Sequence, residues 1–224
     1  MKKILFAIFI ICALSIAFFI FYIPKVTDRN MILYQSLVTY KDVTYKEADG
    51  QALKLDILMP TRDVYEKAPI IYYVHDGDFT SGDKSWLTLD IGEEITKRLL
   101  DEGYCIIAMN FRVLNDHTHF PTSIVDIKDA IRYINSVNGT YDIDPYNVGI
   151  WGSGSGAYMA LTVGYSSSGT FIGDSSLTNY PSNVDYVIDL YGLSQMAARW
   201  DFTSMSGVEL SALQTDFNIW YGST

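Results

Sequence analysis

The chain has 224 residues, of which 49% are hydrophobic and 14% aromatic. This is enough apolar material for the core of one globular domain, and too short a chain for two typical domains. The formal net charge is −10. Without a basic surface to neutralise phosphates, the composition argues against nucleic acid as a partner.

Residues 4–23 form an apolar run that is interrupted only by Cys12 and Ser15, and Lys2 and Lys3 precede it. A helix of this length spans the roughly 30 Å hydrocarbon core of a bilayer. Bulky aromatic residues stand where a signal peptidase would require small ones. We therefore expect an uncleaved single-pass anchor in the cytoplasmic membrane, with a cleaved signal peptide as the alternative. The leading lysines favour a cytoplasmic N-terminus and a domain outside the cytoplasm, although basic residues also follow the run.

We expect residues 1–30 to hold the anchor and the start of a linker that reaches residue 40, and residues 31–224 to form one domain. Alternating apolar and polar residues predict a β-hairpin with strands at 43–46 and 53–59. Continuous apolar runs predict buried strands at 69–74, 104–110, 147–151 and 184–191. Apolar residues at helical spacing predict helices at 86–100, from Pro121 to about 137, and at 155–165.

This order of elements predicts an α/β fold with a mostly parallel central sheet and helices on both faces. In open sheets of this kind, ligands bind past the carboxyl ends of the strands. The loops at 75–84, 112–120 and 152–156 follow three of the predicted strands. We therefore expect these loops to lie on one rim of the sheet and to form the site.

The stretch 147–160 has the layout of a nucleophile elbow, in which a strand turns sharply into a helix around a G-x-S-x-G motif. Gly152 and Gly156 occupy the two outer glycine places. The place of the nucleophile therefore falls on Gly154, which has no side chain. Ser153 and Ser155 flank this position.

Several stretches, in order, make the chain resemble the esterase/lipase branch of the α/β-hydrolases, the group that includes hormone-sensitive-lipase-like, feruloyl and acetyl-xylan esterases. Residues 49–56 resemble the family's opening hairpin, and residues 73–84 resemble its oxyanion loop. Residues 110–112 and 120–133 resemble the following strand and helix. Residues 143–152 lead into the elbow, and residues 189–192 resemble the strand after the elbow helix. The resemblance covers about residues 40–192. It implies an α/β-hydrolase fold and hydrolysis of a small ester or glycan ester, without a cofactor.

The nucleophile position departs from the family pattern, because no acyl-enzyme can form on Gly154. Ser155 is a weak candidate nucleophile, one residue out of place, and Ser153 is weaker. The alternative is that both serines cap the following helix, where serine is favoured.

The oxyanion loop also departs. It falls on His75, Asp76, Gly77 and Asp78, and the resemblance implies that backbone N–H groups here and at Ser155 would bind the developing negative charge. Two carboxylates beside this site would oppose an oxyanion. Asp76 and Asp78 could instead bind a cation or a sugar hydroxyl, or point to solvent.

The remainder of the catalytic triad is not found where the resemblance places it. The family order is Ser, acid, His, but no histidine follows His119 in this sequence. His117 and His119 precede the elbow and are weak candidates for a general base. No Cys/His cluster has metal-ligand spacing, and Cys105, in a predicted core strand, cannot pair with a cysteine in the anchor. We expect no metal site and no disulfide.

Three functions remain open. The chain is a membrane-anchored carboxylic ester hydrolase, a non-catalytic binding protein of the same fold, or a C-terminally truncated and non-functional fragment. The missing serine and the missing histidine predict impaired or no activity. The sequence does not indicate an oligomeric state.

Overall fold

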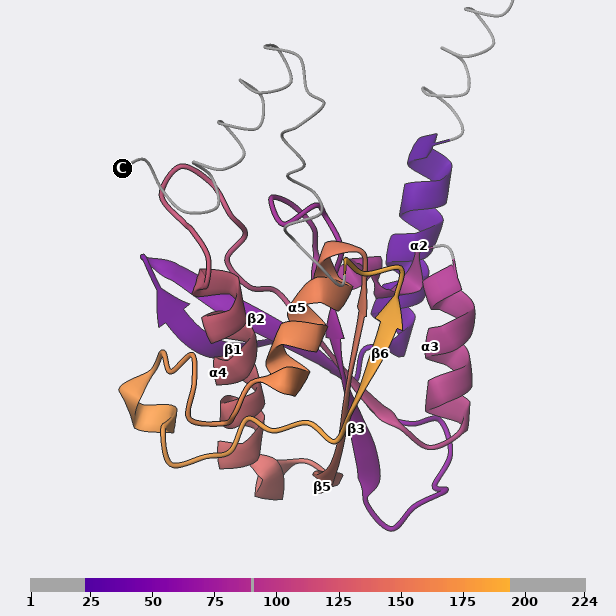
Figure 1. Cartoon of the computed structure of the whole chain (residues 1–224). Coiled ribbons are helices and arrows are strands. Elements are labelled where there is room, and N and C mark those ends of the chain that lie inside the picture. Colours follow the sequence, from indigo (N-terminus) through magenta and orange to yellow (C-terminus); the bar gives the residue numbers. More distant parts are fainter. Residues whose placement is uncertain (1–22, 90, 194–224) are drawn as a thin grey trace, which may run out of the picture.

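The computed structural model describes residues 23–89 and 91–193 (Figure 1). The predicted anchor, apart from Ile23, and the C-terminal residues from 194 onward lie outside this range. No helix in the described part of the chain is long and apolar enough to cross a membrane.

The expected linker after the anchor is instead a helix, α2 (Ile23–Leu37). Seven of its fifteen residues are apolar, but residues 27–30 are all polar and divide them into two groups, so the pattern did not single out a helix. Tyr34 ties it to the domain, because its ring is buried and its hydroxyl donates a 2.7 Å hydrogen bond to Asp56 on the sheet.

The sheet has six strands in the order β1-β2-β4-β3-β5-β6. Their bounds are β1 Tyr40–Ala48, β2 Gln51–Leu58, β3 Ala68–Val74, β4 Cys105–Met109, β5 Ile143–Ser153 and β6 Tyr186–Leu190. The first two strands form the predicted antiparallel hairpin, and β2 also pairs antiparallel with β4. The other four strands are parallel, so the prediction of a mostly parallel sheet is confirmed.

Helices cover both faces of the sheet, with α2 and α3 on one side and α4 and α5 on the other (Figure 1). The bounds are α3 Ile91–Asp101, α4 Thr122–Ser136 and α5 Ser155–Tyr165, and short 3-10 turns are η2 Lys84–Thr88, η3 Asn138–Thr140 and η4 Ser175–Leu177. The helix predicted at 86–100 therefore divides into a 3-10 turn and an α-helix. The other two predicted helices are confirmed.

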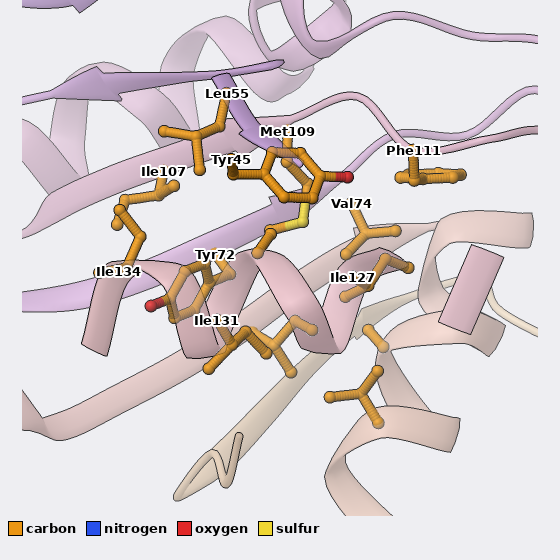
Figure 2. Packing of buried hydrophobic residues seen from close by; sticks show 14 of the residues in the cluster. Tyr45, Leu55, Tyr72, Val74, Ile107, Met109, Phe111, Ile127, Ile131 and Ile134 are labelled. Carbon is orange, nitrogen blue, oxygen red and sulfur yellow. The ribbon is translucent and has the colours of Figure 1, made fainter. Parts of the chain in front are cut away.

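The larger core lies between the sheet and α4 (Figure 2). Four isoleucines at helical spacing, predicted to face the sheet, are at most 1% exposed: Ile124, Ile127, Ile131 and Ile134. They pack against strand residues such as Leu55, Tyr72 and Ile107. Burial of one such side chain contributes roughly 1.5–3 kcal/mol, so this helix face fixes α4 on the sheet.

Buried ion pairs also fix how α4 is oriented relative to the hairpin. Lys46 of β1 lies 2.8 Å from Asp126 and 2.7 Å from Asp129, two buried carboxylates of α4. Asp126 also accepts from Arg112 at 2.7 Å, and Asp129 accepts from Arg132 at 2.9 Å. Because each buried charge has opposite charges beside it, the network holds the hairpin, α4 and the loop after β4 in one arrangement.

The last predicted strand is present as β6, but it is not fully buried as its apolar run suggested. Four of its five residues are half-buried and Asp189 is exposed, and β6 is the edge strand of the sheet within the described residues. A continuous apolar run does not distinguish a central strand from an edge strand, which explains the difference. Cys105 lies in β4 and is completely buried, as predicted.

Candidate active site

A pocket of about 700 Å³ opens at the carboxyl ends of β3, β5 and β6. Two of the three predicted rim loops line it, those after β3 and β5. The third, residues 112–120, contributes no lining residue, although Leu114 donates its N–H to the carbonyl of Phe79 in the first loop at 2.8 Å. The opposite wall comes from the η2–α3 region and from residues 190–193.

The turn between β5 and α5 has Gly154 at its tip, with φ 51° and ψ −119°. Glycine adopts this conformation without strain, whereas the serine of the G-x-S-x-G motif is strained at such a turn. The neighbouring glycines allow close packing. A Cβ on Gly152 would lie 2.5 Å from the nitrogen of Ala157, and one on Gly156 would lie 2.5 Å from the carbonyl oxygen of His75. The sharp strand-to-helix turn inferred from the motif is therefore present.

The carboxylate of Asp76 occupies the centre of the site. Its Oδ1 accepts hydrogen bonds from the N–H of Gly77 at 2.8 Å, the N–H of Ser155 at 3.0 Å and the hydroxyl of Ser155 at 2.9 Å. The N–H of Asp78 is 3.5 Å away. Gly77, Asp78 and Ser155 carry N–H groups from which we expected oxyanion binding, so the chain's own carboxylate lies where an oxyanion would bind.

Asp76 also fills the space above Gly154. A Cβ added to Gly154 would lie 2.6 Å from Cγ of Asp76 and closer still to both of its oxygens. The expectation that Asp76 points to solvent is therefore wrong, whereas Asp78 is exposed at the edge of the pocket. The orientation of Asp76 follows from the first N–H of α5, which attracts a carboxylate.

The Asp76 carboxylate is held in its charged form. Burial by itself would raise its pKa, but the hydrogen bonds from Gly77, Ser155 and Asp78 stabilise the anion and lower the pKa below its usual value. A carboxylate with a lowered pKa accepts a proton poorly. Asp76 is therefore well suited to bind donors and poorly suited to act as a general base.

Neither serine at the turn caps α5 with its side chain, which corrects that expectation. Gly154 is the residue at the N-cap and has no side chain to accept a hydrogen bond; Asp76 supplies the acceptor from another loop. Ser155 is the first residue of the helix and is only 6% exposed. Ser153 ends β5 and lines the pocket.

The histidines do not line the pocket within the described residues. The ring of His75 is 1% exposed, stacks on Phe111 at a centroid distance of 4.2 Å, and places Nδ1 2.7 Å from the carbonyl oxygen of Asp76. Burial lowers its pKa, so the neutral ring is favoured. His117 and His119 lie in the third loop. Over residues 23–89 and 91–193, no group of three potential ligands could hold a metal ion.

Comparison with known proteins now identifies the family. The BD-FAE family model matches residues 55–216. The chain belongs to the BD-FAE family. This BD-FAE domain is 26% identical over 133 residues to the probable carboxylic ester hydrolase LipM of Mycobacterium tuberculosis, in an alignment that covers 59% of this chain and 30% of that protein. It is 24% identical over 142 residues to the arylacetamide deacetylase of Bos taurus, with 62% and 32% covered.

A solved structure similar to this BD-FAE domain is esterase 2 of Thermogutta terrifontis, with a TM-score of 0.60, 18% identity, and 70% of this chain and 58% of that chain covered. At this identity the likeness shows the fold. The chain spans about a third of the length of these two curated relatives. Together these findings confirm the resemblance to esterase/lipase-type α/β-hydrolases and support carboxylic ester hydrolysis as the family-level function.

Our reading of the sequence missed the aromatic lining of the pocket. Trp86 in η2 and Tyr191 after β6 both line it. Trp86 belongs to no motif, and Tyr191 lies in a stretch that we assigned to a strand and not to the site. Only their places in the sequence could have indicated this role, because each residue lies in or next to a segment that meets the carboxyl edge of the sheet.

Proposed function

We propose that this BD-FAE domain is an ester-hydrolase-like protein with impaired or no hydrolytic activity. The observation that supports the proposal is the carboxylate of Asp76, whose Oδ1 accepts the N–H groups of Gly77 and Ser155 beside a turn tip, Gly154, that carries no nucleophile.

Two requirements of serine-dependent ester hydrolysis are unmet in this arrangement. A nucleophile must project from the turn, and Gly154 offers none. The oxyanion donors must be directed at the charge that develops in the transition state, but here they already bind a permanent negative charge. A tetrahedral oxyanion would have to displace Asp76 and then lie beside it.

Ser155 as the nucleophile is the second candidate, favoured by the 2.9 Å hydrogen bond from its hydroxyl to Asp76. In that scheme Asp76 would take the proton of the attacking hydroxyl. The lowered pKa of Asp76 and the burial of Ser155 both oppose it. We therefore expect Ser155 to be a structural donor to Asp76.

Fluorophosphonate labelling of the full chain in non-ionic detergent tests the proposal, because this reagent reports an activated serine without assuming a substrate. The wild-type protein should remain unlabelled while a known serine hydrolase in the same sample is labelled. Cooperative urea unfolding of the same preparation shows that the chain is folded. A label mapped to Ser155 and lost in Ser155→Ala would overturn the proposal.

Replacement of Gly154 by serine should not restore activity by itself, because its new side chain would meet the Asp76 carboxylate. The double variant Asp76→Gly/Gly154→Ser removes this obstacle. Turnover of p-nitrophenyl acetate that rises only in the double variant would identify Asp76 as the steric block. If the single variant were already active, the proposed block would be wrong.

We also propose that residues 4–23 tether the domain to the outer side of the cytoplasmic membrane, and that its natural ligand is a small ester or glycan ester. The apolar run behind two lysines supports the tether, and the family relationship supports the ligand class. After alkaline carbonate extraction the full chain should stay with the membrane, whereas a chain lacking residues 4–23 should not. Protease added to spheroplasts should degrade the domain; protection would refute the orientation.

A further inference from the structure

The pocket combines aromatic rings with negative charge. Five aromatic side chains line it: Tyr73, Phe79, Trp86, Trp151 and Tyr191. The carboxylates of Asp76 and Asp78 also line it, and no lysine, arginine or histidine does so among the described lining residues. The faces of aromatic rings are electron-rich and attract cations, so both components of the lining favour the same charge.

Asp76 provides the fixed charge. Its Oδ1 is occupied by the three donors described above, whereas Oδ2 accepts no hydrogen bond from the described residues. Asp76 lines the pocket and is only partly buried. A ligand N–H or ammonium group can therefore reach a carboxylate oxygen that is already oriented.

The rings that a ligand can reach lie at the mouth. Trp86 is 37% exposed and Tyr191 is 75% exposed, whereas the other three rings are almost completely buried. Asp76 and these two rings line the same pocket, so a cation bound there has both a carboxylate and aromatic rings as partners. Each cation–π contact contributes about 0.5–2 kcal/mol, depending on how far the cation is desolvated.

Backbone strain is concentrated at the same pocket. Asp78, Phe79 and Tyr191 have φ of 52°, 68° and 48°, and they are three of the six described non-glycine residues with positive φ. All three line the pocket. For bulky residues this conformation is unfavourable and persists only where surrounding contacts impose it, which is frequent at ligand-binding sites.

We propose that this pocket binds a small organic cation, with an ammonium group at Oδ2 of Asp76 and its substituents against Trp86 and Tyr191. An anionic ligand would instead meet two carboxylates. The inference rests on the proposed function, because Asp76 must remain in place as a fixed anion and not give way to a reacting ester. It adds the ligand's charge, which the family relationship does not supply.

The test compares choline with dimethylbutanol, its neutral counterpart in which a carbon replaces the quaternary nitrogen. Each is titrated into the folded full chain in non-ionic detergent, and binding is followed by ligand-observed NMR. Choline should bind at least about 10-fold more tightly, since one or two cation–π contacts together with a carboxylate correspond to a factor of this order.

Two variants locate the binding. Asp76→Asn keeps an acceptor oxygen for Gly77 and Ser155 but removes the charge, and it should weaken choline several-fold while changing dimethylbutanol little. Trp86→Leu should weaken choline several-fold and change dimethylbutanol little. The control is Asp63→Asn, which removes the same charge from an exposed loop before β3, far along the strand from the pocket, and should change neither affinity.

Equal binding of the two probes, no choline binding, or choline binding that survives both pocket variants would overturn the inference. These outcomes are separate from the labelling result. A labelled serine would refute the inactive site while leaving the charge preference measurable, and a failed choline titration would leave the absence of an activated serine unchanged.

Discussion

Replacement of Asp76 by alanine should destabilise the fold even though the side chain lies at the edge of a pocket. Three donors would lose their acceptor: the N–H groups of Gly77 and Ser155 and the hydroxyl of Ser155. Hydrogen bonds to a charged group contribute about 1.5–3 kcal/mol each. Water can replace part of this in an open pocket, and removal of a helix cap typically costs about 0.5–2 kcal/mol. We expect a net loss of about 2–3 kcal/mol in the free energy of unfolding.

Urea unfolding of the full chain in non-ionic detergent, followed by tryptophan fluorescence, measures this loss. Asp63→Ala is the matched control, because Asp63 is exposed and makes no hydrogen bond among the described residues. Its stability should change by less than about 0.5 kcal/mol. Asp76→Asn should lose about 1 kcal/mol, because the amide oxygen still accepts but carries no charge.

The pH dependence provides an independent check of the same reasoning. The pKa of Asp76 is lower in the folded chain than in the unfolded chain, so the unfolded state binds more protons between the two values. The advantage of wild type over Asp76→Asn should therefore be complete above about pH 4 and fade as the pH falls towards the folded pKa. Equal stability of Asp76→Ala and Asp63→Ala, or an advantage that does not change in acid, would refute the assignment.

Three further predictions concern the buried polar groups. Asp126→Ala should cost about 3–5 kcal/mol in urea unfolding, because Lys46 and Arg112 lose a buried partner; a loss below 1 kcal/mol would contradict this. Tyr72→Phe should stabilise the fold by about 1 kcal/mol, because the buried Tyr72 hydroxyl has no hydrogen-bond partner among residues 23–89 and 91–193; a less stable variant would contradict this. Burial lowers the pKa of Lys128 to about 8 in the folded chain, whereas the pKa of lysine in the unfolded chain is about 10.4. The free energy of unfolding of the wild type should therefore rise between these two pH values, and Lys128→Met should abolish this rise.

The parts of the fold that the sequence predicted are those set by local pattern. The isoleucines of α4 recur at helical spacing, and the hairpin alternates around a turn, so short-range order determines which face is buried. The helix α2 has no such pattern, and it is joined to the sheet partly through a single buried contact, between Tyr34 and Asp56. That contact joins residues 22 positions apart, which no local rule anticipates.

The candidate site likewise has one part that the local sequence pattern predicts and one part that depends on the tertiary structure. Gly154 was expected at the tip of the turn because the spacing of glycines specifies it, and the structure places it there with a positive φ. Asp76 was recognised as unusual in the oxyanion loop, but the direction of its side chain could not be predicted. That direction depends on the approach of α5 to the loop after β3, which brings the N–H of Ser155 within 3.0 Å.

The contact between Asp76 and Ser155 makes the domain its own competitor for acidic ligands. A carboxylate that is part of the chain acts as a ligand at high effective concentration, because it pays no entropy of association. A free carboxylic acid, such as the product of ester hydrolysis, must displace Asp76 from the N–H groups of Gly77 and Ser155 before it can bind there. Competition with Asp76 therefore lowers the affinity of these N–H groups for acids in solution. That affinity should increase only when the Asp76 carboxylate is removed.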